Sequence, residues 1–349
     1  MTYPRAATSK GRRDLILYDV HRGGHRGDYF RVLRRLVGGY VVTGRPLARL
    51  RLLLGARQVV CSTYDDYFML FFWLSLARSC LGRITVGIAV RSETVFHRGG
   101  FRLKIKSLLL KLLKQLPLTH TLTVMPYWVE PRLASVSSDW IYELQYWDLD
   151  WLDVAAVESV ARFQRTIEVA ARGRKVIGAI GHQRRVKGAE YFMQLYGRAD
   201  MSSQYLFVCI GPRWDVDPAA IETFRSAGGV FIDTQLRDDE VVPIYTLFDV
   251  IWACYRPDYD QSSGIFGRAL QLGLPTIVRA GSYLARLQEG LSNKGYQIPY
   301  ADTDCAARIL LADPSESKAR FEIGPERSFE RLRGILGLAP IHAGMEARR

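Results

Sequence analysis

Cysteine is scarce in this chain of 349 residues, and no two cysteines stand at a ligand spacing. Cys61, Cys80, Cys209, Cys254 and Cys305 are widely scattered, without a C-x-x-C pair. An odd, unpatterned set argues against a disulfide framework and against a zinc site, since both need cysteines in groups. We therefore expect reduced, mostly buried thiols, as in a cytoplasmic protein, and no metal.

Long hydrophobic runs are also lacking. The longest, Tyr67–Ala77, ends at Arg78 and is too short to cross a bilayer, which takes about 20 apolar residues. It is better explained as a buried helix that follows a strand over Val59–Cys61. Residues 1–14 contain no apolar core of a signal peptide, so we expect no secretory leader here.

Acidic residues are rare in the N-terminal part of the chain. Residues 1–132 contain 23 Lys+Arg against 7 Asp+Glu, a net charge of +16; the remainder contains 25 against 28, a net of −3, and the two sum to +13. This asymmetry indicates an anionic partner for the N-terminal half. An anionic membrane and a lipid-diphosphate acceptor fit best. No helix-turn-helix, zinc-finger or RNA-binding signature accompanies the charge, so we expect no nucleic acid partner.

A basic amphipathic helix is predicted over Phe101–Leu116. Its apolar residues recur at i, i+3, i+4 and i+7, and they are Ile105, Leu108, Leu109, Leu112, Leu113 and Leu116. Three lysines, at positions 104, 111 and 114, fall on the other side, together with Leu103 and Leu110. Such a helix can lie in a membrane interface, but the leucine stripe can equally pack on a sheet, and both remain open.

Short apolar strands alternate with helical stretches throughout both halves. Strands are predicted at Leu15–Asp19 and Val86–Val90, and further on at Val176–Ile180, Tyr205–Ile210 and Val230–Ile232. Alternating strands and helices of this kind predict α/β architecture with doubly wound parallel sheets.

Two loops that follow such strands could bind phosphate. Gly181–Gly188 combines glycine with basic residues, and Asp260–Gly264 is a run of small polar residues before a helix-like segment, 266–272. A loop that opens a helix presents free N–H groups and the positive end of the helix dipole. The same pattern fits an ordinary strand–helix turn capped by serine, so both explanations stand.

These C-terminal features resemble the donor-binding domain of GT-B glycosyltransferases, most of all family 4. Gly181–Gly188 is similar to the family's G-R-L-x-x-x-K-G loop, Asp249-Val250 to its aspartate-plus-apolar pair, and Asp260–Pro275 to its E-G-F-G…E-A-x-x-x-G-x-P segment. The resemblance implies a GT-B fold, in which two Rossmann-like domains face a central cleft. The expected parts are an acceptor domain over 1–145, a donor domain over 146–330 and a tail over 331–349.

The resemblance also assigns roles to individual residues. The residues that it assigns to donor binding are Gly181, Arg184, Arg185, Lys187, Ser262, Ser263, Gly264 and Arg268. The catalytic candidates are His97, Asp260 and Lys187, and the candidates for the acceptor side of the cleft are Gly23, Gly24, His25, Arg91 and Glu93. Two positions depart from the family: Arg268 replaces the glutamate that holds the ribose, and His182 replaces the loop arginine. An arginine cannot accept a hydrogen bond from ribose.

The resemblance thus implies a retaining, metal-independent glycosyltransferase. It would move a sugar from a UDP- or GDP-linked donor, with no other cofactor, to a lipid-linked or oligosaccharide acceptor in bacterial surface-polysaccharide biosynthesis. We expect it in the cytoplasm, peripheral on the inner face of the membrane, with 101–116 on the anionic lipid. Arg268 leaves two alternatives open: an inactive glycosyltransferase-like binding protein, or a GT-B sugar-nucleotide epimerase.

Overall fold

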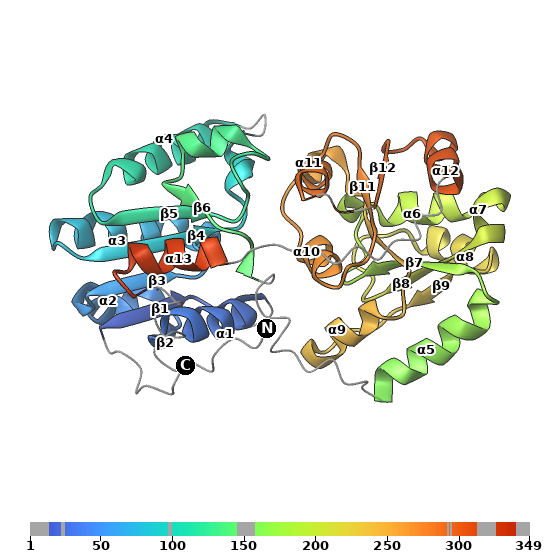
Figure 1. Cartoon of the computed structure of the whole chain (residues 1–349), viewed down its shortest axis with the longest axis horizontal. Helices are drawn as coiled ribbons and strands as arrows, with labels where there is room; N and C mark the ends of the chain where they lie inside the picture. The colour runs from blue at the N-terminus through green and yellow to red at the C-terminus, as the bar shows by residue number, and fades with distance from the viewer. Residues whose placement is uncertain are drawn as a thin grey trace, which may run out of the picture. The chain divides into compact units, whose positions relative to one another are not determined.

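The computed structural model describes residues 14–21, 25–96, 100–144, 158–291, 293, 295–312 and 326–339. The chain divides into two compact units, one of residues 1–150 with 324–349 and one of residues 151–323. Figure 1 shows that each unit is built on its own sheet with helices around it. Both sheets are six-stranded and every strand pairing in them is parallel. The predicted α/β class with two doubly wound sheets is confirmed.

The first sheet has the strand order β2-β1-β3-β4-β5-β6. Its strands are β1 (Leu15–Asp19), β2 (Tyr40–Thr43), β3 (Gln58–Cys61), β4 (Ile84–Ala89), β5 (Thr119–Thr123) and β6 (Asp139–Trp140), and its helices are α1 (His25–Val37), α2 (Pro46–Gly55), α3 (Phe68–Cys80), α4 (Phe101–Gln115) and α13 (Glu326–Ile335). From β1 the chain moves to β2 at one edge of the sheet, and after β2 it moves in the opposite direction, through β3, β4 and β5, toward β6 at the other edge. Because such crossovers are right-handed, α1 covers one face of the sheet and α2, α3 and α4 cover the opposite face.

The second sheet has the strand order β12-β11-β10-β7-β8-β9. Its strands are β7 (Lys175–Ile180), β8 (Tyr205–Ile210), β9 (Val230–Ile232), β10 (Val250–Ala253), β11 (Thr276–Arg279) and β12 (Gly295–Ile298). Its helices are α5 (Glu158–Ala171), α6 (Ala189–Tyr196), α7 (Ala199–Gln204), α8 (Pro218–Ser226), α9 (Asp238–Tyr245), α10 (Gly264–Gln271), α11 (Tyr283–Gly290) and α12 (Thr303–Ala312). This is the strand order of dinucleotide-binding α/β domains, with the order reversing between β7 and β10.

Both faces of the second sheet are buried. Phe207 and Trp252 point into a core with α6, α8 and α12, while Leu206 and Ile251 point into a second core with α5, α9 and α10. A strand with both faces covered needs an unbroken apolar run, which explains why these strands were readable in the sequence. All five cysteines are free. Cys61, Cys209 and Cys254 are buried as predicted, but Cys80 is exposed and Cys305 is half-buried, so the expectation of buried thiols is wrong for these two.

The C-terminal part of the chain departs from the expected division. Residues 331–349 were predicted as a tail after a donor domain ending at 330, but α13 belongs to the first unit. Its Phe329 and Leu332 are buried. The Gln58 amide donates to the Leu336 carbonyl at 2.8 Å. The helix was missed because half of its residues are charged and its short apolar face packs on residues that are far away in the sequence.

Helix α4 forms where it was predicted, but its packed face is different. Leu110 and Leu113 are buried against the unit. Phe101, Ile105, Leu108 and Leu112, spaced i, i+4, i+7 and i+11, remain exposed. The alternative in which the leucine stripe packs on the sheet is therefore wrong for Ile105, Leu108 and Leu112, three of the six residues of that stripe. Among the described helices, none is long and apolar enough to cross a membrane.

Arg78 holds the layer of α2 and α3 together without any carboxylate. This side chain of α3 is completely buried. It donates to the carbonyls of Leu53, Ala56, Arg57 and Ile84 and to the Thr85 hydroxyl. Burial lowers the pKa of the guanidinium to about 10, so it remains charged at neutral pH. One arginine thus satisfies carbonyls at the end of α2 and at the start of β4.

Replacing Arg78 by methionine should destabilise the first unit by about 3–5 kcal/mol, because several buried acceptors lose their donor at once. Hydrogen exchange of the full chain measures this, and faster exchange should be confined to the first unit. The control is Arg51→Met on the exposed surface of α2, with an expected change below about 0.5 kcal/mol. Equal effects of the two variants would show that the Arg78 bonds contribute little.

Candidate functional site

The two phosphate-loop candidates flank the point where the second sheet reverses its strand order. The loop over 181–188 leaves the carboxyl end of β7, and the segment over 254–264 leaves the carboxyl end of β10, its neighbour in the sheet. Ligands of open α/β sheets bind at this point because the loops on its two sides turn apart. The structure therefore brings the two predicted loops to one place.

The loop over 181–188 is held by close backbone contacts. The Gly181 N–H donates to the Ile210 carbonyl at 2.9 Å. The buried Gln183 amide donates to the Gly181 carbonyl at 2.7 Å. Gly188 has φ +73°, and a Cβ there would lie 2.3 Å from the Cys254 carbonyl oxygen. Only glycine fits at 188, because both its left-handed backbone and its approach to the second loop exclude a side chain.

Arg184 and Lys187 form a cationic pair that has no counter-anion among the described residues. The Arg184 Nε is buried and has no hydrogen-bond partner. Lys187 makes no ion pair with any carboxylate of the described residues. Burial, helped by the nearby charge of Arg184, lowers the pKa of Lys187 to about 8. Two partly desolvated cations without a carboxylate are suited to bind an anion with several oxygens.

The neighbouring Arg185 is arranged differently. Its guanidinium binds Glu190 at 2.8 Å on the exposed side of the loop. Its backbone N–H donates to Asp215 Oδ1 at 2.8 Å. Of the three predicted basic residues of this loop, Arg185 is thus the one already neutralised.

The second loop caps α10, the helix that follows it. The Ser263 Oγ accepts a hydrogen bond from the Phe266 N–H at 3.2 Å and also bonds the Tyr255 hydroxyl at 2.8 Å. Ser262 and Gly264 stay partly exposed at the start of the helix. The serine cap proposed as an alternative explanation is therefore present. It fixes the first turn of α10, next to the loop over 181–188.

Asp260 and Arg268, the positions that match the family's two glutamates, are both engaged within the unit. Asp260 Oδ1 accepts from the Tyr283 N–H at 3.0 Å and pairs with Arg279 at 3.1 Å. Its Oδ2 makes no hydrogen bond with a described residue. Arg268 is 6% exposed and donates to Gln271 at 2.7 Å. Asp260 thus retains one acceptor oxygen, and Arg268 presents little surface to a ligand.

An exposed tryptophan beside the cationic pair was missed in the sequence. Trp214, in the loop after β8, is 66% exposed. Its ring lies edge-on to His182 at 5.4 Å and 6.0 Å from the Arg184 guanidinium. Burial and the charges of Lys187 and Arg184 lower the pKa of His182, which is therefore neutral at pH 7. The signal available was an aromatic residue directly after a strand ended by Gly211-Pro212.

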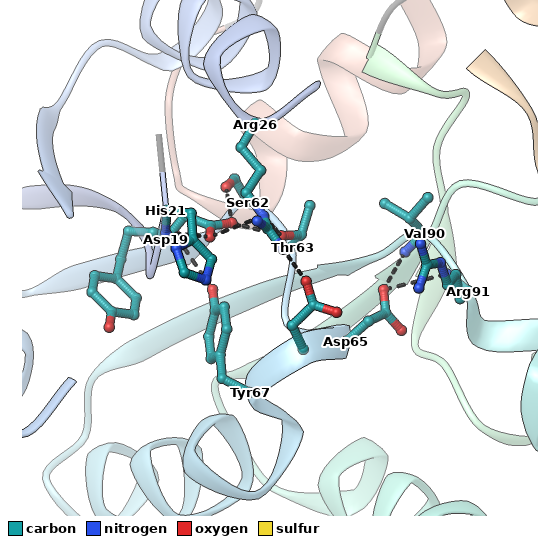
Figure 2. Close-up of polar contacts among 11 residues, drawn as sticks. Asp19, His21, Arg26, Ser62, Thr63, Asp65, Tyr67, Val90 and Arg91 are labelled. Carbon is teal, nitrogen blue, oxygen red and sulfur yellow. Dashed lines mark hydrogen bonds and ion pairs between the residues drawn. The ribbon is translucent and has the colours of Figure 1, made fainter. Parts of the chain in front are cut away.

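The corresponding point of the first sheet, between β1 and β3, is closed by an internal network (Figure 2). Asp19, at the end of β1, is completely buried. It accepts from the Ser62 hydroxyl at 2.7 Å and the Thr63 hydroxyl at 2.6 Å. Arg26 pairs with Asp19 at 3.4 Å and also binds Asp66. The charges here are compensated by their own neighbours.

Asp65 links the same segment to the loop after β4. Its Oδ2 accepts from the Val90 N–H at 2.7 Å and the Arg91 N–H at 3.3 Å (Figure 2). Its Oδ1 lies 3.7 Å from the Lys106 Nζ. The predicted acceptor residues Arg91 and Glu93 therefore lie in the loop that Asp65 holds. Arg91 is exposed and Glu93 is buried.

Three predicted site residues of the first unit lie outside the described residues: Gly23, Gly24 and His97. The backbone of His25 begins α1. The described residues contain no group of three His, Cys, Asp or Glu side chains that could hold a metal ion.

By sequence, the chain matches no family model and no curated protein. Its fold is similar to that of Anabaena HepE in complex with UDP, with a TM-score of 0.60 and 11% identity over 96% of this chain and 99% of the other. The S. aureus MnaA–UDP structure matches with a TM-score of 0.61 and 14% identity, over 93% of this chain and 97% of the other. A UDP-forming α,α-trehalose-phosphate synthase from Burkholderia xenovorans matches with a TM-score of 0.53 and 10% identity, over 93% of this chain and 96% of the other.

The chain has a GT-B fold. The resemblance to GT-B glycosyltransferases found in the sequence is thus confirmed at the level of fold. At 10–14% identity these likenesses carry no residue-level correspondence. The assignment of roles within this GT-B chain therefore rests on its own geometry.

Gly188→Ala should displace the loop over 181–188 and destabilise the second unit by about 2–4 kcal/mol, because the new Cβ would overlap the Cys254 carbonyl. Thermal unfolding measures the effect. Gly173→Ala is the matched control: its φ is +81°, but nothing lies within 4 Å of the added Cβ. A loss no larger than that of the control would mean that left-handed strain alone, without the close contact, explains the glycine.

Proposed function

We propose that this chain is a glycosyltransferase that takes its sugar from a nucleotide-diphosphate donor bound to the second unit. The observation that carries the proposal is the uncompensated pair Arg184 and Lys187 at the reversal point of the second sheet. HepE and MnaA, which share the fold, were both crystallised with UDP. A diphosphate is the anion that such a pair, next to the start of α10, would fit.

The proposed chemistry follows from charge. Cleavage of the sugar–phosphate bond leaves a diphosphate whose negative charge grows in the transition state. Arg184 and Lys187 would stabilise that charge together with the N–H groups at Ser262, Ser263 and Gly264. Because these groups supply the positive charge, the proposed reaction is metal-independent.

The sugar and the nucleoside would be held by fewer acceptors than in the family. The remaining oxygen of Asp260 is the proposed partner of a sugar hydroxyl, with His97 as the second catalytic candidate. No carboxylate occupies position 268, so the ribose must bind elsewhere. Retention of configuration and a UDP- or GDP-linked donor remain part of the proposal.

The proposed acceptor is a lipid-linked glycan, handled by an enzyme peripheral to an anionic membrane in bacterial surface-polysaccharide biosynthesis. The exposed stripe of α4, Phe101, Ile105, Leu108 and Leu112, supports this setting, because it leaves an apolar face open on a helix that also carries exposed lysines.

Arg268 favours a second candidate, a glycosyltransferase-like protein that binds a glycan or a partner without transferring sugar. Its guanidinium is mostly buried and bound to Gln271. The two functions differ in nucleotide binding, which only the transferase needs.

Lys187→Ala should weaken UDP or GDP binding by about 100-fold and abolish turnover, because a charge-assisted contact to the diphosphate is worth about 1.5–3 kcal/mol. Titration calorimetry with both nucleotides checks the binding. The matched control is Arg185→Gln, which removes a charge two residues away that already binds Glu190, and should cost less than about fivefold.

Two results of that titration would decide between the functions. Equal losses in the two variants would move the diphosphate site away from Lys187. A cooperatively folded wild-type chain that binds neither nucleotide would reject the transferase and favour the binding protein.

Diphosphate binding should also weaken as the pH rises above about 8. The Lys187 pKa is lowered to about 8 in the free protein, and a bound diphosphate would raise it. Binding above this pH therefore requires proton uptake, and affinity should fall by up to about tenfold per pH unit, while staying level between neutrality and pH 8. The conservative variant Lys187→Arg stays charged and should give a flat profile. A flat wild-type profile would contradict the assignment.

A further inference from the structure

Three neighbouring helices of the first unit contain no acidic residue. Helices α2, α3 and α4 cover one face of the first sheet, and α3 packs against both of the others (Figure 1). Their sequences, PLARLRLLLG, FMLFFWLSLARSC and FRLKIKSLLLKLLKQ, carry seven Lys and Arg residues besides the buried Arg78, and no Asp or Glu. A solvated helix surface ordinarily mixes both signs of charge, so this layer is unusual.

The same layer exposes large apolar side chains on all three helices. The outward set comprises Leu47 and Leu52 of α2, Met69 and Trp73 of α3, and Phe101, Ile105, Leu108 and Leu112 of α4. Leu47 is 82% exposed, Phe101 77% and Trp73 59%. Apolar exposure on this scale, repeated over adjacent helices, marks an interaction surface. We refer to these three outward helix surfaces as the α2–α4 face.

Exposed cations are interspersed with these apolar residues. They are Arg49 and Arg51 on α2 and Arg102, Lys104 and Lys111 on α4. Long basic side chains keep their charge in the headgroup layer while their stems and the neighbouring apolar groups enter the acyl boundary. Aromatic rings such as that of Trp73 suit the same interfacial depth.

We propose that the α2–α4 face binds an anionic lipid bilayer as one surface. The inference rests on the proposed function, in which α4 alone meets the membrane, and extends the contact to Met69 and Trp73 of α3 and to the arginines of α2. Arg78 fixes α3 to α2, because it donates to the last carbonyls of α2 and to the carbonyl at the start of β4. Helix α4 packs against α3.

Charge decides between a bilayer and other occupants. A second copy of the chain, related by two-fold symmetry, would place this face against itself and set cations against cations with no carboxylate between them. A nucleic acid would satisfy the charges but not eight outward apolar groups. An anionic bilayer satisfies both.

Vesicle flotation of the full-length chain tests the proposal. Vesicles of phosphatidylcholine alone are compared with an equal mixture of phosphatidylcholine and phosphatidylglycerol. Three paired variants address one helix each: Arg49→Gln with Arg51→Gln, Met69→Ser with Trp73→Ser, and Lys104→Gln with Lys111→Gln. The control pair is Arg165→Gln with Val169→Ser on the exposed surface of α5 in the second unit.

The expected result is binding to the anionic vesicles at least about tenfold tighter than to phosphatidylcholine. Each arginine or lysine pair should weaken it by about 25-fold, since each basic residue near an anionic surface contributes about fivefold. The α3 pair should weaken it by about tenfold or more through lost apolar burial. The control pair should bind like the wild type.

Several results would overturn the inference. Loss only in the α4 variant would reduce the surface to a single helix. Equal binding to both vesicle types would remove the role of charge. Dimerisation without vesicle binding would make the face an interface between copies. A chain that ignores vesicles but still binds UDP or GDP, with binding lost in Lys187→Ala, would lose this inference alone and keep the donor site.

Discussion

The second unit depends on an imbalance of charge that its backbone maintains. Arg184 and Lys187 are close to each other, and no carboxylate in the described part of the chain pairs with them. Burial, together with the charge of Arg184, lowers the pKa of Lys187 to about 8. The loop over 181–188 cannot relax away from this arrangement, because Gly188 approaches the Cys254 carbonyl and Gln183 is bonded to the Gly181 carbonyl. Binding of the proposed diphosphate would relieve the repulsion between the two cations.

At the reversal point of the first sheet, the charged groups are paired with one another. This point holds Asp19, Ser62, Thr63 and Arg26, which bond one another (Figure 2). Arg26 also pairs with Asp66. A closed network of this kind makes a rigid edge and leaves little capacity for a charged ligand at that point. The excess positive charge of the first unit lies on its helices instead. Among the described residues, the reversal points of the two sheets thus carry different electrostatics: the first has its charges paired, and the second has two unpaired cations.

The sequence predicted much of the fold because the buried strands are nearly continuous apolar runs. The limits expected for the strands over Leu15–Asp19, Tyr205–Ile210 and Val230–Ile232 agree with β1, β8 and β9. Glycine and basic residues directly after β7 and small polar residues after β10 identified the two loops, because the carboxyl edge of a parallel sheet is where such residues gather.

Other features depended on contacts between distant residues and could not be read locally. Arg185 and Lys187 look equivalent in the sequence. In the structure, Arg185 is exposed and pairs with Glu190, whereas Lys187 is more buried and its pKa is lowered. The apolar stripe of residues 105–116 was visible, but which leucines pack was decided by the neighbours of α4, which bury Leu110 and Leu113. Trp214 became noticeable only once its ring was seen beside Arg184.

Helix α13 has a consequence for how the chain is made. The first unit takes its last helix from residues 326–335, after the whole second unit has been synthesised. Until α13 docks, Gln58 lacks its partner at Leu336 and the Leu36 carbonyl lacks the Arg333 guanidinium. On the ribosome, the second unit is therefore the first that can be completed, and the N-terminal unit waits with an open side. The half that is made first is therefore the later one to complete its contacts.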